Sequence, residues 1–365
     1  MLEVNIKPVW LFRTESGEDF DFQLLNLLRE IHATGKLTHA SLRVGLSYRH
    51  AWNMIARWSE FFSNPLVQME KGRGAKLTLL GEKLLWAEER IQARLAPQFK
   101  NLCSELELEI NRALNDSKQV LRIRASHGYA IAKLVEHMSR CIDIQLDLQY
   151  LESREALQSL ERHECELAGF HIPESPLGEE AIDRFYPWFR RRPQTTIHFV
   201  TRRQGLILAK NNPLNLKKFS DITRHGVRYI NRQQGSGTRM LFELLLEHHQ
   251  IDQEMINGYQ QEEFTHDAVA AFVASGMADA GLGIEAAARH FDLEFIPLAR
   301  EHYMLACRLE ALETPRIRDL LILLKTPSFR ESINSIPGYA APCAGEVVKP
   351  GELFKLKSEI PEPTS

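Results

Sequence analysis

The residues best placed for chemistry lie in a glycine-rich segment from Asn231 to Arg239, which reads Asn-Arg-Gln-Gln-Gly-Ser-Gly-Thr-Arg. It follows a predicted strand over 227–231 and begins a predicted helix after Gly237. Glycines let the backbone approach a ligand closely, and the free amides at a helix N-terminus attract an anion. We therefore predict a small-anion site here, with the ligand-binding residues Asn231, Ser236, Gly237, Thr238 and Arg239.

Two other interpretations of this segment stay open. It can be a tight strand-to-helix turn that binds nothing. Arg239 can also point away from the ligand and pair with Glu243, which lies four residues later on the same helix face. A nucleotide-binding P-loop is excluded, because the segment has no Gly-Lys-Ser/Thr ending.

A second strand-to-helix turn has similar chemistry at Ala125-Ser126-His127-Gly128. Two helix N-termini that face each other across a cleft form a clamp for an oxyanion. Ser126 and His127 are the contacts we expect from this turn, although His127 can also be an ordinary surface histidine.

The charge pattern indicates a different partner for the first hundred residues. The whole chain of 365 residues has a formal charge of −3. Between Lys36 and Lys76, however, seven basic residues stand against two acidic ones, a local charge of +5. Such an asymmetry is the electrostatic footprint that a nucleic-acid-binding surface requires.

The same stretch has the pattern of a helix-turn-helix followed by a wing. A predicted helix with an apolar face over 22–31 ends at Gly35, Thr38 is expected to cap a short helix to Val44, and Ser47 a third helix over 48–62. Trp52, Ile55, Ala56, Trp58 and Phe62 are its expected apolar residues. A strand over 66–70, a basic tip and a return over 76–78 form the wing.

The third helix is the predicted recognition helix. We expect Arg49 to pair with guanine and Asn53 with adenine in the major groove, while basic residues of the wing contact phosphates. The alternative is a small helical domain with a solvated charged face. The predicted DNA-binding residues are Thr38, Ser47, Tyr48, Arg49, His50, Asn53, Arg57, Lys71, Arg73 and Lys76.

A long helix follows from Thr78 towards Leu114, and Pro97 is expected to kink or split it. Its apolar residues step by sevens, threes and fours, which is typical of a helix that pairs with another helix. We predict a homodimer or higher homo-oligomer through this seam; the alternative is packing on its own domain. The seam consists of Leu84, Ile91, Leu95, Phe99, Leu102, Leu106, Ile110 and Ala113.

Beyond a linker at 115–118, strands and helices alternate, which predicts an α/β domain with a mostly parallel sheet. Separate strands are expected at 197–200 and 206–209. The predicted domains are a winged helix-turn-helix over 1–78, a linker helix over 79–116 and an effector domain over 117–358, with a disordered tail over 359–365. Its two lobes are expected at about 117–200 with 297–358, and at 201–296.

Other features narrow the class of protein. The five cysteines are odd in number and scattered, with no Cys-x-x-Cys pair, so we expect neither a disulfide scaffold nor a zinc site. No signal peptide and no membrane span is evident, and we expect a cytoplasmic protein. We find no arrangement typical of a catalytic triad and no metal site, and therefore expect neither enzyme activity nor a cofactor.

Two family resemblances add to this interpretation. The run Leu46-Ser47-Tyr48-Arg49-His50-Ala51-Trp52, with segments 31–35, 40–41, 65–67 and 72–78 and Gly81, resembles the DNA-binding domain of the molybdate-responsive ModE regulators, which is related to that of LysR-type regulators. This resemblance covers about residues 20 to 95 and implies a homodimer that binds a partly palindromic operator.

The second resemblance covers about residues 118 to 345. Segments 203–206, 212–213, 231–239, 265–270, 276–284, 295–298 and 301–303 resemble the periplasmic-binding-protein-like domain of ModE-type regulators, which is also fused to molybdopterin-biosynthesis proteins. The resemblance implies a two-lobed fold and a ligand such as molybdate, tungstate or a molybdenum-cofactor species.

Together these features predict a transcriptional regulator that binds a double-stranded DNA operator and senses a small oxyanion. One alternative keeps the regulator and changes the effector to a small carboxylate such as formate, since both anions would use the same helix N-termini. Another is a ligand carrier or an enzyme of molybdenum-cofactor metabolism that does not bind DNA.

Overall fold

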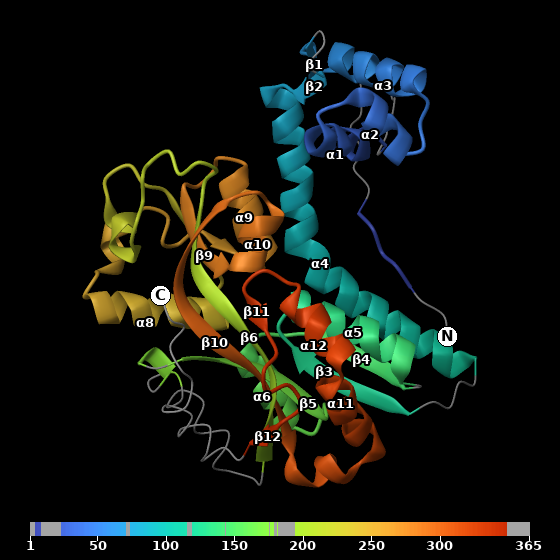
Figure 1. Cartoon of the computed structure of the whole chain (residues 1–365), viewed down its shortest axis with the longest axis vertical. Coiled ribbons are helices and arrows are strands. Elements are labelled where there is room, and N and C mark those ends of the chain that lie inside the picture. Colours follow the sequence, from blue (N-terminus) through green and yellow to red (C-terminus); the bar gives the residue numbers. More distant parts are fainter. Residues whose placement is uncertain are drawn as a thin grey trace. The chain divides into compact units, whose positions relative to one another are not determined.

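The computed structural model describes residues 4–8, 23–70, 74–114, 119–142, 144–174, 176–178, 181 and 194–348. The chain divides into two compact units: an N-terminal unit, Lys7–Ala93, and a C-terminal unit made of Met1–Ile6 and Arg94–Ser365. Figure 1 labels most of the helices and strands of both. Each unit is described by itself.

The N-terminal unit begins with three helices, α1 (Gln23–Thr34), α2 (Leu37–Arg43) and α3 (Tyr48–Phe61). A two-stranded antiparallel sheet of β1 (Val67–Glu70) and β2 (Gly74–Leu77) follows, and then the first part of α4 (Leu79–Ala113). The apolar face of α1 packs on α3 in a core that includes Leu24, Leu28, Ile31 and Trp58. This order of elements is the one predicted from the sequence.

The helix ends follow the capping residues in most cases. Ser47 caps α3 by accepting a hydrogen bond from the His50 amide, as predicted, and Thr78 Oγ1 accepts from the Gly81 amide at the start of α4. The cap predicted at Thr38 is wrong. Helix α2 begins one residue earlier, at Leu37, because Leu37 is buried in the core of the unit. Its N-cap is Lys36, whose side chain makes no capping hydrogen bond.

The long helix α4 is continuous through Pro97, so the predicted split does not occur. The predicted seam is also not uniform. Leu84 packs against the core of the N-terminal unit, whereas Leu102, Leu106 and Ile110 are 48%, 40% and 37% exposed. These three lie four residues apart and form an exposed apolar stripe on one helix face.

The C-terminal unit contains a mixed sheet. Its main strands are β3 (Val120–Ala125), β4 (Gln145–Tyr150), β5 (Leu167–Pro173), β6 (Gln194–Leu208), β7 (Tyr229–Arg232), β8 (Glu262–Glu263), β9 (Ala280–Ile284) and β10 (Glu294–Arg308), in the order β4-β3-β5-β10-β6-β9-β7-β8. Two short strands, β11 (Tyr339–Ala340) and β12 (Val347–Val348), pair with β6.

Only the two flanks of this sheet are parallel, so the prediction of a mostly parallel sheet is wrong at its centre. The centre consists of β6 and β10, two long antiparallel strands that Figure 1 shows as extended and curved. The two separate strands predicted at 197–200 and 206–209 are a single strand, β6. The polar residues between them look like a turn in the sequence, but Arg202 and Gln204 are buried by partners on neighbouring elements.

The two central strands connect the lobes. Lobe I is formed by β3, β4 and β5, the helices α5 (Tyr129–Cys141), α6 (Ser153–Glu161), α11 (Pro315–Lys325) and α12 (Pro327–Asn334), and nearby halves of β6 and β10. Lobe II is formed by β7, β8, β9 and the helices α8 (Gly237–His249), α9 (His266–Ala274) and α10 (Glu285–His290). The chain enters lobe II after Leu208 and leaves it at Glu294, which pairs directly with Leu208. Three short 3-10 helices lie at Phe219–Thr223, Gln253–Met255 and Leu309–Glu313.

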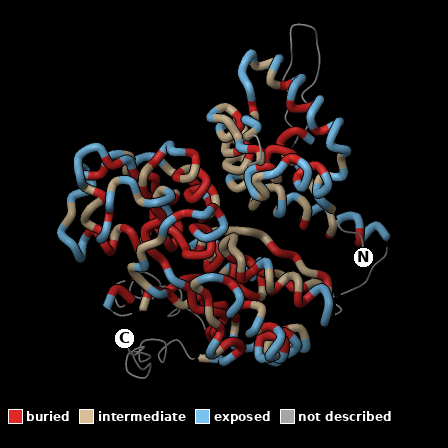
Figure 2. The backbone as a smooth tube through the Cα atoms, turned by 45° about the horizontal axis from the view of Figure 1, so that its top comes forward, coloured by how far each residue is buried: buried red, intermediate tan, exposed pale blue. Residues whose placement is uncertain are grey.

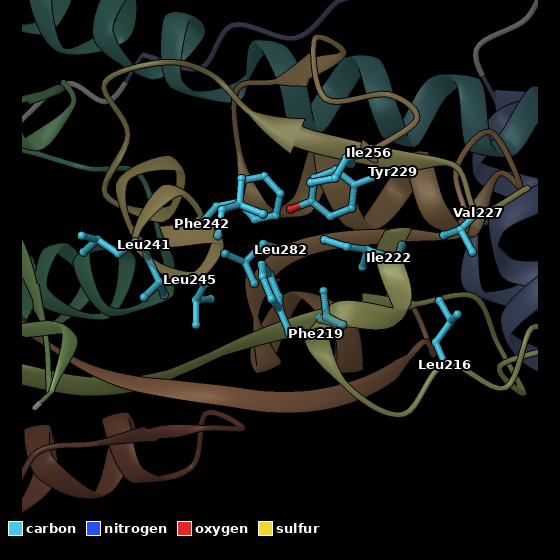
Figure 3. Packing of buried hydrophobic residues seen from close by; sticks show 14 of the residues in the cluster. Leu216, Phe219, Ile222, Val227, Tyr229, Leu241, Phe242, Leu245, Ile256 and Leu282 are labelled. Atoms are coloured by element: carbon cyan, nitrogen blue, oxygen red, sulfur yellow. The ribbon is translucent and has the colours of Figure 1, made fainter. Parts of the chain in front are cut away.

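The core of lobe II holds α8 against the sheet. Figure 3 shows its buried side chains, in which the rings of Tyr229 and Phe242 stack with centroids 4.8 Å apart. Leu241 and Leu245 extend the same face of α8 into the cluster. This packing fixes the rotation of α8 about its axis and so decides which residues of its first turn face lobe I. In Figure 2 the backbone tube is coloured by how far each residue is buried.

Three general observations complete the fold. The five cysteines are all free. Within the described ranges, no three His, Cys, Asp or Glu side chains gather as a metal ion would require. No helix of the described part is long and apolar enough to cross a membrane.

Candidate functional site

The turn from β3 to α5 carries the first candidate residues. Gly128 is the N-cap of α5 and provides no side-chain cap. The hydroxyl of Ser126 is buried, and no hydrogen-bond partner for it exists in the described part of the chain. The carbonyl oxygen of Ser126 accepts a hydrogen bond of 3.1 Å from the hydroxyl of Tyr303 on β10.

The turn from β7 to α8 carries the second set. Ser236 caps α8, since its Oγ accepts from the Arg239 amide at 3.1 Å and donates to the Gln233 carbonyl at 2.9 Å. Thr238 Oγ1 accepts from Gln204 Nε2 at 2.9 Å. A methyl group added at Gly237 would lie 3.4 Å from the Cβ of His171, an ordinary van der Waals contact, so this turn lies directly against lobe I.

The two turns meet at one pair of aromatic rings. His171, next to Gly237, lies against Tyr303 with ring centroids 4.0 Å apart, and Tyr303 in turn binds the backbone of Ser126. The structure thus brings together Ser126, Gly237 and the neighbouring Thr238, as the pairing of two helix N-termini predicts.

Two predicted ligand contacts have structural partners instead. The guanidinium of Arg239 pairs with Glu243 at 3.0 Å and with Glu262 at 3.3 Å, and lies 4.3 Å from the ring centre of Tyr259. Its side chain is 3% exposed, and of the two orientations considered for Arg239 the pairing with Glu243 is the one observed. The rotation of α8 about its axis directs Arg239 towards Tyr259.

Asn231 is also held by the backbone. Its Nδ2 donates to the Tyr259 carbonyl at 3.2 Å, and its Oδ1 accepts from the Arg232 amide at 3.0 Å. The amide therefore stabilises the end of β7, and the ligand contact predicted for Asn231 has no support in this geometry.

Arg232 is the most important residue that the sequence reasoning missed. It is 6% exposed, and its Nε has no hydrogen-bond partner among the residues that the structure describes. One terminal nitrogen donates to the Phe264 carbonyl at 3.0 Å and lies 3.6 Å from Glu152 of lobe I. Its position at the carboxyl end of a strand, beside the glycines, was a usable signal, since ligands bind at that edge of α/β sheets.

The central strands contribute further missed residues. Arg202 on β6 pairs through its Nε with Glu301 on β10, which is 0% exposed. Gln204 Nε2 donates both to Glu301 at 3.0 Å and to Thr238. Ten residues are linked by direct contacts or by their positions along the turn from β7 to α8, and we call them the junction cluster. They are Ser126, Glu152, His171, Arg202, Gln204, Arg232, Gln233, Thr238, Glu301 and Tyr303.

Burial and nearby charges keep His171 of the junction cluster, and His127 and His266, neutral. Burial and nearby cationic side chains lower the pKa of His127 to about 3. Burial, followed by the charges of Arg202 and Arg232, lowers the pKa of His171 well below its usual range. Burial also lowers the pKa of His266, at the start of α9. These imidazoles supply neutral N–H donors beside guanidinium groups, which is a suitable environment for an anion.

Two sets of contacts fasten the lobes together. Gln233 Nε2 of lobe II donates to Glu152 of lobe I at 2.6 Å. The hydroxyl of Tyr129, at the start of α5, donates to Asp267 at 2.6 Å and lies 3.0 Å from Nδ1 of His290. The two lobes are therefore held in one arrangement relative to each other.

The N-terminal unit contains the residues predicted to bind DNA. Most of those on α3 are exposed, as a groove-reading helix requires, and Lys76 pairs with Glu70 across the β1–β2 strands at 3.0 Å. Arg57 lies over the ring of Trp58 at 5.4 Å. Lys71 and Arg73 lie outside the described residues. The exposed members of the predicted set are Thr38, Ser47, Tyr48, Arg49, His50, Asn53, Arg57 and Lys76.

Two residues predicted to be apolar core of α3 are exposed. Trp52 is 44% exposed and Ala56 is also at the surface, because Met54 replaces them on the buried face. Trp52 and Ala56, with Met69 of β1, line a hollow of about 150 Å³. This apolar hollow lies between α3 and β1 of the N-terminal unit.

Comparisons with known proteins agree with the fold of the C-terminal unit. The family described as the PBP superfamily domain matches residues 135–325, more than half of the chain. The uncharacterised protein YvgK of Bacillus subtilis (strain 168) is 26% identical over 215 residues, which cover 59% of this chain and 69% of YvgK.

Two further matches concern a shorter segment and a solved structure. The molybdenum-pterin-binding protein MopB of Rhodobacter capsulatus is 36% identical over 111 residues, 29% of this chain and 38% of MopB, so the match spans well under half of that relative. Among solved structures, a hydrogen-peroxide-bound OxyR mutant of Corynebacterium glutamicum aligns over 86% of this chain and 93% of its own, with 13% identity and a TM-score of 0.44.

Proposed function

The chain belongs to the PBP superfamily, and we propose on that premise that it is a transcriptional regulator that binds a small anion and an operator DNA. The observation that carries the proposal is the combination of two surfaces in one chain. The C-terminal unit has unpartnered buried donors on β5, at the end of β7 and in the turn before α5, and the N-terminal unit exposes a polar and basic face on α3.

The anion site is supported by donor chemistry. Ser126 Oγ, His171 Nε2 and Arg232 Nε are buried and have no partner among the described residues. Leaving a buried donor unpaired costs about 1–3 kcal/mol, more for a charged group. An anion that accepts from these donors removes that cost, and the free amides at the starts of α5 and α8 add to the attraction.

The DNA-binding role is supported by the geometry of α2 and α3. Two short helices joined by a turn at Gly45, followed by an antiparallel hairpin, match the arrangement in which the second helix enters the major groove. We assign base contacts to Arg49 and Asn53, and phosphate contacts to Arg57 and the wing. The exposed apolar stripe of α4 is the surface that we assign to homodimer formation.

The finer proposal is that the anion is molybdate, tungstate or a molybdenum-cofactor species, and that the regulated genes concern molybdenum or tungsten. The resemblance to ModE regulators and the likeness of a part of the chain to the molybdenum-pterin-binding protein MopB support this choice. Formate is the alternative effector within the same class of regulator.

An electrophoretic mobility shift with the DNA upstream of the protein's own gene tests the proposal. We expect a sequence-specific complex whose affinity changes when molybdate or tungstate is added. A chain that binds the anion but no DNA is a ligand carrier or an enzyme of molybdenum-cofactor metabolism. Arg49→Ala is the control variant, because it should weaken the complex without changing anion binding.

A further inference from the structure

The junction cluster contains unpartnered acceptors as well as unpartnered donors. Glu301 Oε2, Gln204 Oε1 and Gln233 Oε1 are buried and have no hydrogen-bond partner in the described part of the chain. These three oxygens lie on β10, on β6 and in the turn before α8. They belong to the same connected set as the donors Ser126 and Arg232.

The orientation of both amides is determined by carboxylates. Gln204 Nε2 donates to Glu301 at 3.0 Å, and Gln233 Nε2 donates to Glu152 at 2.6 Å. A carboxylate only accepts hydrogen bonds, so neither amide can be turned around without losing its bond. The unpartnered oxygens of Gln204 and Gln233 are therefore true acceptors.

The charges of the cluster are balanced rather than strongly positive. The carboxylates of Glu152, Glu301 and Asp267 all act on the guanidinium of Arg232, and Arg202 acts on it with the opposite sign. Lys100 is the further cation near Asp267 and His127. A fully deprotonated dianion near these carboxylates has no proton with which to donate a hydrogen bond to them.

From these observations we propose that the natural ligand is a small anion that also carries an O–H or N–H donor. This inference rests on the anion sensing of the proposed function, and among the effectors considered there it disfavours molybdate, tungstate and formate. The anionic end accepts from Ser126, His171 and Arg232, and the donor end is accepted by Glu301 Oε2 with the oxygens of Gln204 and Gln233. A bare oxyanion such as molybdate or tungstate, or a simple carboxylate such as formate, satisfies only the first group.

Matched pairs of anions test this selectivity. Isothermal titration of the full chain compares monohydrogen phosphate with sulfate and glycolate with acetate, since each pair differs by one donor group. Molybdate, tungstate and formate are titrated beside them. We expect the donor-bearing member of a pair to bind about tenfold tighter or more.

Glu301→Gln tests the assigned acceptor. Arg202 Nε and Gln204 Nε2 hold one carboxylate oxygen, so the new amide places an N–H donor where Oε2 stands. The preference for donor-bearing anions should then be lost or reversed. Since Glu301 also pairs with the buried Arg202, Gln233→Met provides a second variant at a less buried position, with the exposed neighbour Gln234→Met as its control.

The outcomes separate this inference from the proposed function. If sulfate and acetate bind as tightly as their partners, or if molybdate or tungstate binds tightest, the inference is wrong while anion sensing stands. If no anion binds, the anion site of the proposed function fails and the inference fails with it. If both single variants, Glu301→Gln and Gln233→Met, keep the full preference for donor-bearing anions, the assigned acceptors are wrong.

Discussion

Replacing Arg232 with methionine separates ligand binding from folding within the glycine-rich segment. Methionine retains the apolar stem of the side chain and removes the guanidinium. A hydrogen bond to a charged group contributes about 1.5–3 kcal/mol, and each 1.4 kcal/mol is a factor of ten in affinity. Arg232→Met should therefore weaken anion binding by about 10- to 150-fold.

The same change should alter the stability of the unliganded protein very little. Burial lowers the pKa of Arg232, which means that its charge is already costly in the folded state. The variant loses the 3.0 Å hydrogen bond to the Phe264 carbonyl and the long, 3.6 Å contact with Glu152, while Glu152 keeps its hydrogen bond from Gln233. The removed burial cost offsets the lost contacts.

Arg239→Met is the matched control, seven residues away in the same segment. It removes the pairs with Glu243 and Glu262, whose side chains are 35% and 29% exposed, so solvent screening limits their contribution. We expect a loss of about 1–2 kcal/mol in the free energy of unfolding and unchanged anion affinity.

Titration calorimetry and thermal unfolding of both variants, with glycolate and molybdate as ligands, provide the comparison. The reasoning is refuted if Arg239→Met loses affinity while Arg232→Met retains it. That result would restore the inward orientation of Arg239 and remove Arg232 from the site.

Three other predictions follow from separate parts of the molecule. Arg49→Ala should cost about 1–3 kcal/mol at one base pair and relax operator preference, whereas Lys76→Ala should weaken all DNA sequences evenly, as measured by mobility shifts at several salt concentrations. Leu106→Glu should shift the chain from dimer to monomer in sedimentation, because a charge enters the apolar stripe of α4; a dimer of unchanged affinity would exclude this surface. Because the folded-state pKa of His127 is about 3, below its unfolded value, the unfolded state binds more protons at acidic pH and stability falls as the pH drops below about 6.5. His127→Gln should reduce this loss in unfolding experiments between about pH 7.5 and pH 5, and an equally steep loss in the variant would contradict the assignment.

Local signals predicted the helix boundaries well. The caps at Ser47 and Thr78 and the glycine stop after α1 depend on neighbours within a few residues, so the sequence contains the information that decides them. The cap at Thr38 failed because burial of Leu37, a tertiary effect, set the start of α2.

Contacts between residues far apart in the sequence determined the features that local patterns did not predict. Arg202 and Gln204 interrupt an apolar pattern and indicate a turn until Glu301 and Thr238 are known to bind them. The choice between Arg232 and Arg239 as the ligand residue depends on how α8 is rotated against Tyr259 and the lobe II core. The local sequence around these two arginines does not indicate how α8 is rotated.

The direct pairing of Leu208 with Glu294 has a consequence for protein engineering. Lobe II leaves and rejoins the rest of the chain at adjacent residues of two paired strands, so residues 209–293 form a continuous insertion with neighbouring ends. Segments with this topology tolerate exchange as a cassette, because the junction needs no new linker geometry. Grafting this segment from a relative, or joining a fluorescent reporter across the same two positions, should therefore retain lobe I and the N-terminal unit. Such a chimera would combine the lobe II residues of another protein with an unchanged lobe I and N-terminal unit.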